Sequence, residues 1–564
     1  MIKNNGNLLE FSKNILANKK FAVIFSSILL IISGLLDALG LSLIAPTVSL
    51  LISEPGNLTS ETEIIENLKG IFNFFKIPYS LRYVLGAIAV IMLLRSIFIF
   101  WQNFYIAILQ NEYTSELGKN YHKFISSLKW HDFKQHNQSS SINILNETMR
   151  AGRSLRSYVN MIANFYTIGI YLVFLAIISF EMTFISVILS LLIIIIFSRI
   201  MVTSNILGKK QSGKAQELIQ NMSDSINFAK YIRTHGKMSF MTKKLFGSFD
   251  SFKKNQIRLG FNESIFQASY EYAFIGFLML GLLIAARFFE LPASTIALIT
   301  IVLYRLFQRL KIFQQNYQTF NKTVPGFFTV KNELDKTFEN KDDWGKKRFS
   351  DLQNNIELKD ASFNIGDRKI ISKFNAKFEK NKITAITGKS GSGKTTLIDI
   401  ITGLTDLDKG TILVDGEDIK NFSRNSYQNS IGYVDQNALL FNDSILNNLN
   451  WGQKKNITRK QIYSVAKDLK IHDLILSLPD SYNSNVGDFG NSLSGGERQR
   501  IVIARTLINE PKLIILDEAT SQLDSKSQAI VMNLLKKIKT TTTIIMVTHR
   551  NETLDIADNI IEIN

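Results

Sequence analysis

The chain has 564 residues, of which 46% are hydrophobic and 20% are charged, and its formal net charge is +17. It contains no cysteine, which excludes disulfide bonds and thiol-bound metal sites. An excess of positive charge suits a nucleic-acid partner or a membrane surface, and the placement of the basic and apolar residues decides between these classes.

The first 335 residues contain long apolar segments. A membrane-spanning helix needs about 20 mostly apolar residues, and the segment 185–197 is apolar on every side, as expected in lipid rather than in the core of a soluble protein. Two tight hairpins are expected, at Phe180-Glu181 and around 289–292. The sequence therefore predicts six spans, at residues 21–45, 81–108, 158–180, 182–202, 272–290 and 293–313.

The distribution of charge predicts how these spans are oriented. Four lysines precede the first span, and the stretch between the fourth and fifth spans is rich in Lys and Arg. The loop after the first span is instead acidic, with Glu54, Glu61, Glu63 and Glu66. By the positive-inside rule both termini are cytoplasmic, so the net charge reports membrane topology and no nucleic-acid partner is expected. The first span is too long for a signal-peptide core and no cleavage pattern follows it, so we expect it to remain in the mature protein.

Polar segments between the spans extend the helices beyond the membrane. The second span continues to Leu128, and two turns far from the membrane are expected near 139–149 and 223–234. Solvated loops are the alternative, although so many polar residues without structure would be unusual in a compact protein. The predicted division is a membrane domain at 1–335, a linker at 336–352 and a second domain at 353–564.

The second domain contains a phosphate-binding pattern. Residues 388–395 read Gly-Lys-Ser-Gly-Ser-Gly-Lys-Thr, between a predicted strand at 383–387 and a predicted helix at 396–401. Glycines let backbone N–H groups surround a phosphate, and the helix N-terminus adds a positive dipole. Lys394 is expected to reach the β- and γ-phosphates, and the Thr395 hydroxyl to bind Mg²⁺. Taken alone, this pattern indicates only a nucleoside triphosphate, with a Gly/Ser-rich surface turn as the alternative.

Downstream segments supply carboxylates and a second glycine-bearing helix start. The run 513–516 is continuously apolar, as in a buried parallel strand, and it ends at Asp517 and Glu518. Ligands bind beyond the carboxyl ends of such strands, so Asp517 is expected to hold Mg²⁺ and Glu518 to polarise the attacking water. The segment 493–500 reads Leu-Ser-Gly-Gly-Glu-Arg-Gln-Arg, and a further strand at 543–547 leads to His549.

This set of segments resembles the nucleotide-binding domain of ATP-binding-cassette (ABC) transporters. The resemblance implies a Walker A loop at 388–396, a Walker B strand at 513–517 and a signature motif at 494–497, which caps the ATP of the opposite subunit. It also implies that Glu518 is the catalytic carboxylate, that His549 contacts the γ-phosphate, and that Gln436 meets Mg²⁺. The full set of implied nucleotide-site residues is Gly388, Lys389, Ser390, Gly391, Ser392, Gly393, Lys394, Thr395, Thr396, Gln436, Ser494, Gly495, Gly496, Glu497, Asp517, Glu518 and His549.

Two positions depart from the family pattern. Glu497 stands where glutamine is commoner, which we interpret as a tolerated variant. The aromatic residue on which the family stacks adenine aligns with Ile365. Phe363 would face the same side of a regular strand, although core packing is the favoured interpretation of this residue. We therefore expect weak base selectivity, with GTP or CTP supporting turnover almost as well as ATP.

Six spans and one ATPase domain make half of a transporter in this family. The resemblance thus implies a membrane all-α domain of six transmembrane helices, exporter-like of type IV, fused to an α/β P-loop ATPase domain. It implies ATP and Mg²⁺ as cofactors and a homodimer with two ATP sites at its interface, located in a bacterial inner membrane. It also implies that binding of ATP closes the two ATPase domains and that hydrolysis releases them.

Charged residues in or near the spans bear on the cargo, because charge there is costly and usually faces a cavity or a partner. Arg95 and Arg305 lie deepest and are the candidate substrate path, since guanidinium groups bind phosphate oxygens well; Arg287 and Arg309 are expected to extend toward the membrane surface. The segments 34–46, 93–95 and 303–306, with an outer helix expected near 60–75, resemble bacterial flippases of lipid-linked oligosaccharides. A peptide or drug exporter would share every nucleotide-site motif and is the alternative; an importer and a membrane-anchored regulatory ATPase fit the six fused spans less well.

Overall fold

A computed structural model of the protein falls into two compact units. The helical unit comprises Met1–Leu128 and Lys134–Glu339, and the α/β unit comprises Lys129–Phe133 and Asn340–Asn564. The structure describes residues 2–44, 47, 70, 72–74, 76, 78–128, 130–135, 138–288, 293–335, 344–366, 368–452 and 457–563. The expected outer helix lies largely outside these residues, as do the expected hairpin at 289–292 and the first half of the linker.

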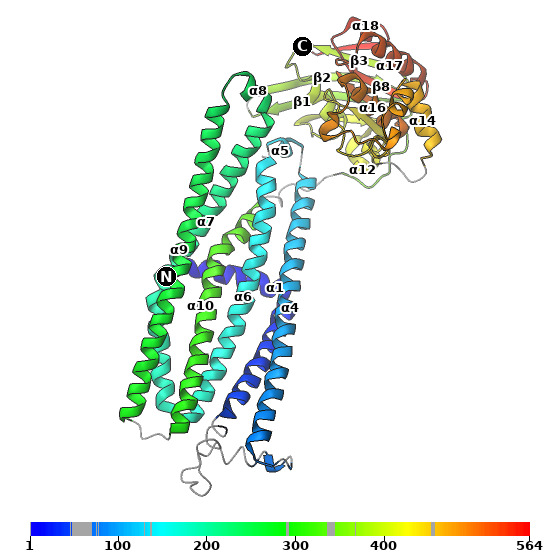
Figure 1. Ribbon diagram of the computed structural model, residues 1–564. Helices are drawn as coiled ribbons and strands as arrows, with labels where there is room; N and C mark the ends of the chain where they lie inside the picture. Colours follow the sequence, from blue (N-terminus) through cyan, green and yellow to red (C-terminus); the bar gives the residue numbers. More distant parts are fainter. Residues whose placement is uncertain are drawn as a thin grey trace. The chain divides into compact units, whose positions relative to one another are not determined.

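Among the described residues, six long helices dominate the helical unit (Figure 1). They are α1 (Ile2–Ser42), α4 (Leu81–Ser127), α6 (Gln138–Ile178), α7 (Phe180–Asn227), α9 (Met238–Phe288) and α10 (Ala293–Asp335). Each predicted span falls on one of them, and α6 and α7 meet at Ser179, which confirms the expected hairpin. Helix α6 packs extensively along α10, and α7 packs along α9.

Two details of these helices differ from a simple series of spans. Helix α1 is kinked at Lys19, where φ is −132°, so its first part runs in a different direction from the rest. The turn expected near 139–149 is wrong: these residues lie within α6, and the short helix is instead α5 (Trp130–Gln135). Its counterpart, α8 (Ala229–Thr234), lies within the range expected for the second turn.

The composition of four helical segments suits a membrane. Among the described residues, four are long and apolar enough to cross one: Leu8–Ser42, Leu81–Ser127, Asn143–Ile178 and Phe180–Asn227. Many of their large apolar side chains are exposed, including Phe21, Phe180 and Ile177. Exposed apolar surface on this scale is expected for helices that contact lipid rather than water.

Two sheets form the α/β unit. A parallel sheet has the strand order β6-β7-β8-β3-β9, and an antiparallel sheet has the order β2-β1-β4-β5. The strands are β1 (Asn355–Ile365), β2 (Arg368–Glu379), β3 (Ile383–Gly388), β4 (Lys409–Val414), β5 (Glu417–Asp418), β6 (Ile431–Val434), β7 (Leu513–Asp517), β8 (Thr543–Val547) and β9 (Asn559–Ile563).

Helices cover the parallel sheet (Figure 1). They are α11 (Lys394–Ile401), α12 (Arg424–Gln428), α13 (Ile445–Leu449), α14 (Arg459–Asp468), α15 (His472–Leu476), α16 (Gly495–Ile508), α17 (Ser525–Ile538) and α18 (Asn551–Leu554), with single 3₁₀ turns at Ile419–Asn421, Ser481–Asn483 and Asp488–Gly490.

The residues of β7 show why this sheet needs a cover on both faces. Ile514 and Leu516 belong to one apolar cluster, whereas Leu513 and Ile515 belong to another on the opposite face. Successive side chains of a strand point to opposite faces, so a continuous apolar run buries both, as the sequence predicted. This packing fixes the carboxyl ends of β3, β6, β7 and β8 at one edge of the sheet.

Candidate nucleotide-binding site

The predicted phosphate loop connects β3 to α11. A Cβ atom on Gly388 would collide with the carbonyl oxygen of Ile563, and the φ angle of Gly388 is 148°. Gly393, which caps α11, has a φ of 97° in the left-handed region, where side chains other than glycine are strained. The loop therefore passes from strand to helix through backbone conformations that favour glycine, and the N-terminus of α11 is left at the end of the sheet.

The polar side chains of this loop suit a phosphate. Lys394 is 8% exposed, and its Nζ donates hydrogen bonds of 2.8 Å to the carbonyl oxygens of Gly388 and Lys389. Ser392 Oγ is buried without a hydrogen-bond partner among the described residues. A phosphate group would give both a charged acceptor, so the loop fits a nucleotide. Thr395 is exposed at the start of α11, and α11 packs against β3 and β7.

Three predicted residues meet at the carboxyl ends of β6, β7 and β8. Gln436 Nε2 donates a 2.9 Å hydrogen bond to Glu518 Oε2, and His549 Nε2 lies 3.8 Å from Glu518 Oε1. Asp517 is the last residue of β7 and Glu518 follows it. The structure thus places the amide of Gln436 and the imidazole of His549 beside the carboxylate of Glu518, next in sequence to Asp517.

Burial shapes the ionisation of Asp517. Burial, with smaller contributions from Asp435 and Glu518, raises the pKa of Asp517 to about 6. Burial and the neighbouring carboxylates make the ionised form of Asp517 unfavourable. A bound divalent cation would neutralise this charge and so stabilise the ionised carboxylate. Mg²⁺ prefers oxygen ligands and is usually bound by one or two carboxylates or hydroxyls together with phosphates, so Asp517 and Thr395 fit this ion.

The sequence analysis did not identify Tyr433 and Asp435 as part of this site. The Tyr433 hydroxyl donates a 3.4 Å hydrogen bond to Asp517 Oδ2, and burial raises the pKa of the hydroxyl, as do nearby carboxylates. Tyr433 lies in β6, and Asp435 follows Val434, the last residue of that strand. A prediction that β6 pairs in parallel with β7 would have identified them, because this pairing places Tyr433 opposite Ile515, two residues before Asp517.

The predicted signature segment forms the start of α16. Ser494 Oγ accepts a hydrogen bond from Glu497 N, and Ser494 N donates a 2.8 Å bond to Glu497 Oε2. Glutamate and glutamine can both close such a capping box, which is consistent with the interpretation of Glu497 as a tolerated variant. A Cβ on Gly495 would lie 3.2 Å from Gln522 Oε1, and one on Gly496 would lie 3.8 Å from Leu523.

Phe363 and Ile365 differ in their exposure to solvent. Phe363 packs against the apolar cluster around β1, whereas Ile365 is 46% exposed at the end of the strand. The pairing register of β1 with β2 shifts between Phe363 and Asn364, where the unpaired extra residue is Ile370 of β2. The irregularity thus lies in β2 and leaves the alternation of side chains along β1 in place. Core packing of Phe363 was the favoured interpretation.

Charged groups inside the helical unit form a cluster. Arg95 Nε of α4 lies 3.1 Å from Oδ1 of Asp37 of α1, and the hydroxyl of Tyr171 of α6 donates to the other oxygen. Asp37 and Tyr171 are fully buried. Arg309, expected to extend toward the membrane surface, instead contacts Asn164 Oδ1 at 3.5 Å. Arg305 is half-buried and bonds to none of the described side chains.

Comparisons with known proteins agree with this geometry. Residues 371–521 match the family model of the ABC transporter. A solved bacterial Atm1-family ABC exporter with ATP bound is similar over 96% of this chain and 94% of its own, with a TM-score of 0.79 and 19% identity. The protein therefore has the fold of an ABC exporter, a helical transmembrane region fused to a C-terminal ABC ATPase domain.

Sequence relatives are similar over shorter stretches. An ATP-dependent lipid A-core flippase of Syntrophus aciditrophicus is 38% identical over 210 residues, which are 37% of this chain and 35% of the relative. A putative multidrug export ATP-binding/permease protein of Staphylococcus aureus is 37% identical over 232 residues, 41% of this chain and 40% of the relative. Multidrug resistance protein 1 of Entamoeba histolytica is 40% identical over 217 residues, 38% of this chain and 17% of the relative. The matched stretches thus span less than half of the curated relatives.

Proposed function

We propose that this protein is an ATP-driven exporter of the flippase type. It acts as a homodimer and moves a lipid-linked oligosaccharide or a related amphipathic lipid from the cytoplasmic side outward. The observation that carries this proposal is that one chain joins long apolar helices to a sheet edge where a phosphate loop, Asp517, Glu518, Gln436 and His549 converge. The relative named as a lipid A-core flippase supports a lipid cargo.

The hydrolysis step depends on positioning rather than on covalent chemistry. The loop N–H groups and Lys394 would hold the phosphates, and Thr395, Gln436 and Asp517 would hold Mg²⁺, whose charge would offset the negative charge of the phosphates. Glu518 orients the attacking water and accepts its proton, and His549 contacts the terminal phosphate. The existing bond from Gln436 to Glu518 links the metal-binding and water-orienting groups.

The signature segment provides the argument for two copies. Ser494 caps a 14-residue helix, α16, whose N-terminus offers N–H groups and a positive dipole to an anion. In the proposed dimer this end closes over the ATP held by the phosphate loop of the second copy. Since the chain has no cysteine, the variants Ser390→Cys and Ser494→Cys in one chain should form a cross-link between copies in the presence of ATP. Either cysteine alone should not, and an ATP-independent or absent cross-link would contradict the arrangement.

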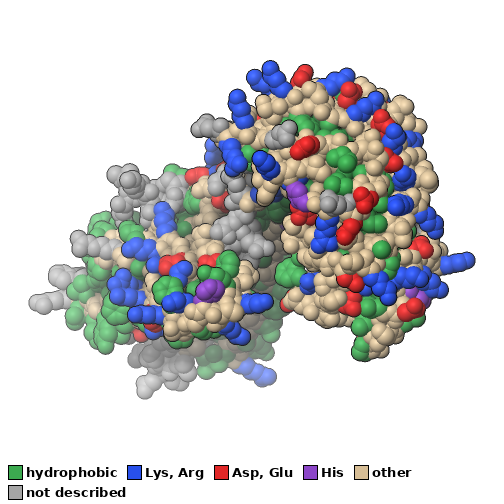
Figure 2. Space-filling model, turned by 90° about the horizontal axis from the view of Figure 1, so that it is seen from above, with side chains coloured by type: hydrophobic (Ala, Val, Ile, Leu, Met, Phe, Trp, Pro, Cys, Tyr) green, Lys and Arg blue, Asp and Glu red, His purple; other side chains and the backbone are tan. Residues whose placement is uncertain are grey.

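The proposed location is a bacterial inner membrane with both termini in the cytoplasm. The face of the protein in Figure 2 carries many Lys and Arg side chains interspersed with Asp and Glu. A charge distribution rich in lysine and arginine suits the cytoplasmic side of a membrane. The proposed cytoplasmic position of the ATPase domain gives it access to ATP.

Cargo recognition in this proposal involves Arg95 and Arg305. Arg305 has no competing partner among the described side chains, whereas Arg95 is held by Asp37 and would have to exchange this carboxylate for a phosphate. Asp37 pairs with Arg95 and with Tyr171, and Tyr171 also interacts with Arg309, so two guanidinium groups lie near one carboxylate. The remaining positive charge suits a pyrophosphate-linked lipid.

ATPase activity of the purified protein in lipid, with and without a polyprenyl-pyrophosphate oligosaccharide, tests the proposal, and Glu518→Gln provides the blank. Stimulation should fall in Arg305→Ala and persist in Arg305→Lys. Arg95→Ala is best measured together with Asp37→Asn, so that no buried carboxylate is left unpaired. If these alanine variants are stimulated like the parent protein, the phosphate-binding role is wrong.

A peptide or drug exporter of the same fold is the second candidate, favoured by the relatives named for multidrug export and resistance. Unchanged basal hydrolysis in the presence of the glycolipid, together with stimulation by an apolar drug or peptide, would favour it. Hydrolysis no greater than that of Glu518→Gln would instead contradict the assignment of the catalytic carboxylate.

A further inference from the structure

The residue after His549 holds the segment that follows Glu518. Arg550 donates two hydrogen bonds from its guanidinium group, one of 2.7 Å to the carbonyl oxygen of Ser521 and one of 3.1 Å to Oε1 of Gln528. Ser521 ends a turn that begins at Glu518, because Ser521 N donates a 3.0 Å bond to the carbonyl of Glu518. One side chain thus reaches from the end of β8 to the turn beyond the proposed catalytic carboxylate.

Both acceptors of Arg550 are neutral. Among the described residues no carboxylate pairs with its guanidinium group. Gln528 is 3% exposed, and its amide also donates a 3.3 Å bond to Thr553 Oγ1, which fixes the direction of the amide oxygen. A guanidinium group forms stronger hydrogen bonds than a neutral donor and presents its N–H groups in one plane. Arg550 therefore holds the two ends of the segment 521–528 in a defined arrangement.

The backbone around His549 is fixed by the same residue. Arg550 N donates a 3.1 Å bond to Oγ1 of Thr548, which is 4% exposed, and the carbonyl of Arg550 accepts a 3.1 Å bond from Thr553 N. The imidazole of His549 lies 3.8 Å from Glu518 Oε1. The side chain of Arg550 thus holds the turn after the carboxylate, while its backbone holds the residue that carries the imidazole.

The turn that Arg550 holds also lies against the start of α16. Gln522 follows Ser521 directly, and a Cβ atom on Gly495 would lie 3.2 Å from Gln522 Oε1. A displacement of this turn would change the surroundings of Glu518. It would also change the packing of the helix end that, in the proposed dimer, closes over the ATP of the second copy.

From this arrangement we infer that Arg550 is a positioning residue for ATP hydrolysis, which sets the direction of Glu518 relative to His549. The inference rests on the roles of these two residues in the proposed function. The hydrogen bonds of Arg550 go to segments other than the phosphate loop, where Lys394 lies. Loss of the guanidinium group should therefore lower kcat and leave the affinity for ATP nearly unchanged.

Steady-state ATP hydrolysis by the full-length protein in lipid tests the inference. In Arg550→Ala, kcat should fall by about 10- to 100-fold, since a displacement of about 1 Å in a positioned group can cost about a hundredfold in rate. KM should stay close to that of the parent protein, as should the affinity for Mg-ATP, measured by titration with Glu518→Gln present in both proteins. Arg550→Lys should recover part of the loss, because its ammonium group can still donate to the carbonyl of Ser521.

The contact with Gln528 provides an internal test. Gln528→Leu removes one of the two acceptors and replaces a buried side chain by an apolar one, so kcat should fall less than in Arg550→Ala. The protein with both substitutions should hydrolyse ATP like Arg550→Ala alone, because the two residues act through one interaction. Losses that simply add would mean that the residues act separately and would overturn the proposed linkage.

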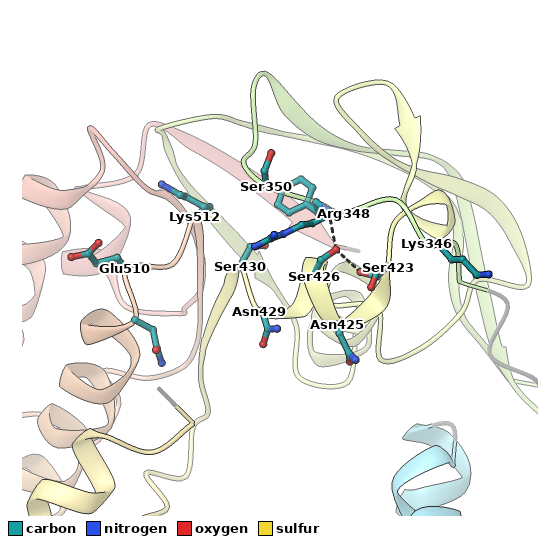
Figure 3. Close-up of a pocket in the computed structure, with 12 residues that line it drawn as sticks. Lys346, Arg348, Ser350, Ser423, Asn425, Ser426, Asn429, Ser430, Glu510 and Lys512 are labelled. Carbon is teal, nitrogen blue, oxygen red and sulfur yellow. Dashed lines mark hydrogen bonds between the residues drawn. The ribbon is translucent and has the colours of Figure 1, made fainter. Parts of the chain in front are cut away.

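Two controls separate this effect from a loss of stability or of charge. Arg424→Ala removes a guanidinium group that also donates to a carbonyl, that of Gly403 at 2.8 Å, beyond the end of α11 that is remote from the phosphate loop. Arg348→Ala removes the same charge from a groove beside α12, whose lining side chains point in different directions (Figure 3). Both controls should keep the kcat of the parent protein, and Arg424→Ala should lower the melting temperature about as much as Arg550→Ala.

Three results would contradict the inference in different ways. A kcat of Arg550→Ala equal to that of the parent would overturn it. An equal loss of kcat and of Mg-ATP affinity would also overturn it, because Arg550 would then act on nucleotide binding or on the stability of the whole unit. A parent protein that hydrolyses ATP no faster than Glu518→Gln would refute the proposed catalytic carboxylate itself, so this failure is distinguishable from the other two.

Discussion

Replacing Asp517 by asparagine should stabilise the nucleotide-free protein while abolishing its response to Mg-ATP. Asp517 is 8% exposed, and burial raises its pKa from 3.8 to about 6. The difference is about 2.2 pH units, and one unit corresponds to about 1.36 kcal/mol, which gives at most about 3 kcal/mol. Glu518 beside it is 31% exposed, so solvent screens part of the repulsion. We therefore expect a gain of about 2 kcal/mol at pH 7.

The dependence on pH follows from the direction of the shift. A carboxyl group with a raised pKa in the folded state costs nothing below its unfolded pKa, because it is then protonated in both states. The cost grows between pH 3.8 and about 6 and is complete above this range. The advantage of Asp517→Asn should thus be full at pH 7, smaller at pH 5 and absent near pH 4.

Thermal unfolding of the α/β unit in the full-length, detergent-solubilised chain provides the assay. For a domain of this size about 1 kcal/mol shifts the melting temperature by roughly 2–4 °C, so the variant should melt roughly 4–8 °C higher at pH 7. Added Mg-ATP should raise the melting temperature of the parent protein but not of the variant. Asp524→Asn is the control, because a hydrogen bond with Ser527 lowers the pKa of Asp524 and its loss should bring no stabilisation.

Two results would refute this reasoning. If Asp517→Asn melts no higher than the parent at pH 7, burial does not oppose the ionisation of this carboxylate. If the gain persists near pH 4, its cause is packing or hydrogen bonding and not charge. Either result would also remove the argument that a divalent cation relieves an unfavourable charge at the end of β7.

Further variants test the phosphate loop, the base site and the buried ion pair. Gly388→Ala should abolish ATP binding, measured by titration, because its Cβ would collide with the Ile563 carbonyl. Ile365→Tyr should tighten ATP binding, measured by titration, by roughly two- to tenfold, since an aromatic contact contributes about 0.5–1.5 kcal/mol; a strong preference for ATP over GTP in hydrolysis by the parent protein would contradict the weak base site. Arg95→Ala should destabilise the helical unit by about 3–5 kcal/mol in unfolding experiments because it leaves Asp37 buried and unpaired, and adding Asp37→Leu should recover much of this loss.

The sequence predicted the local structure around the candidate nucleotide site because its residues occupy short segments with a fixed local geometry. The glycines of the phosphate loop, the apolar strand before Asp517 and the polar residue pair at Ser494 and Glu497 each act within a few residues of one another. Parallel strands then bring their carboxyl ends to a common edge, where Glu518 lies beside Gln436 and His549, two residues that the family resemblance had singled out.

Features that depend on pairing between distant segments were not predictable in the same way. The register shift after Phe363 depends on how β1 pairs with β2, and nothing in the local sequence specifies it. The partner of Arg95 is 58 positions away, on α1, and only the packing of α1 against α4 reveals it. The turn near Trp130 was misplaced because polar residues on both sides of it are equally compatible with an exposed helix.

The backbone and side chain of Glu518 contact the ends of several strands. Its φ angle is 47°, in the left-handed region that is unusual for a residue other than glycine and costs of the order of 1–3 kcal/mol. Its N–H donates a 3.1 Å bond to the carbonyl of Val547, which fixes its backbone to the end of β8. Its side chain accepts a bond from Gln436, beyond β6, and faces His549. A displacement of any of these strand ends would therefore change the direction of the carboxylate, so hydrolysis can depend on the positions of three segments at once.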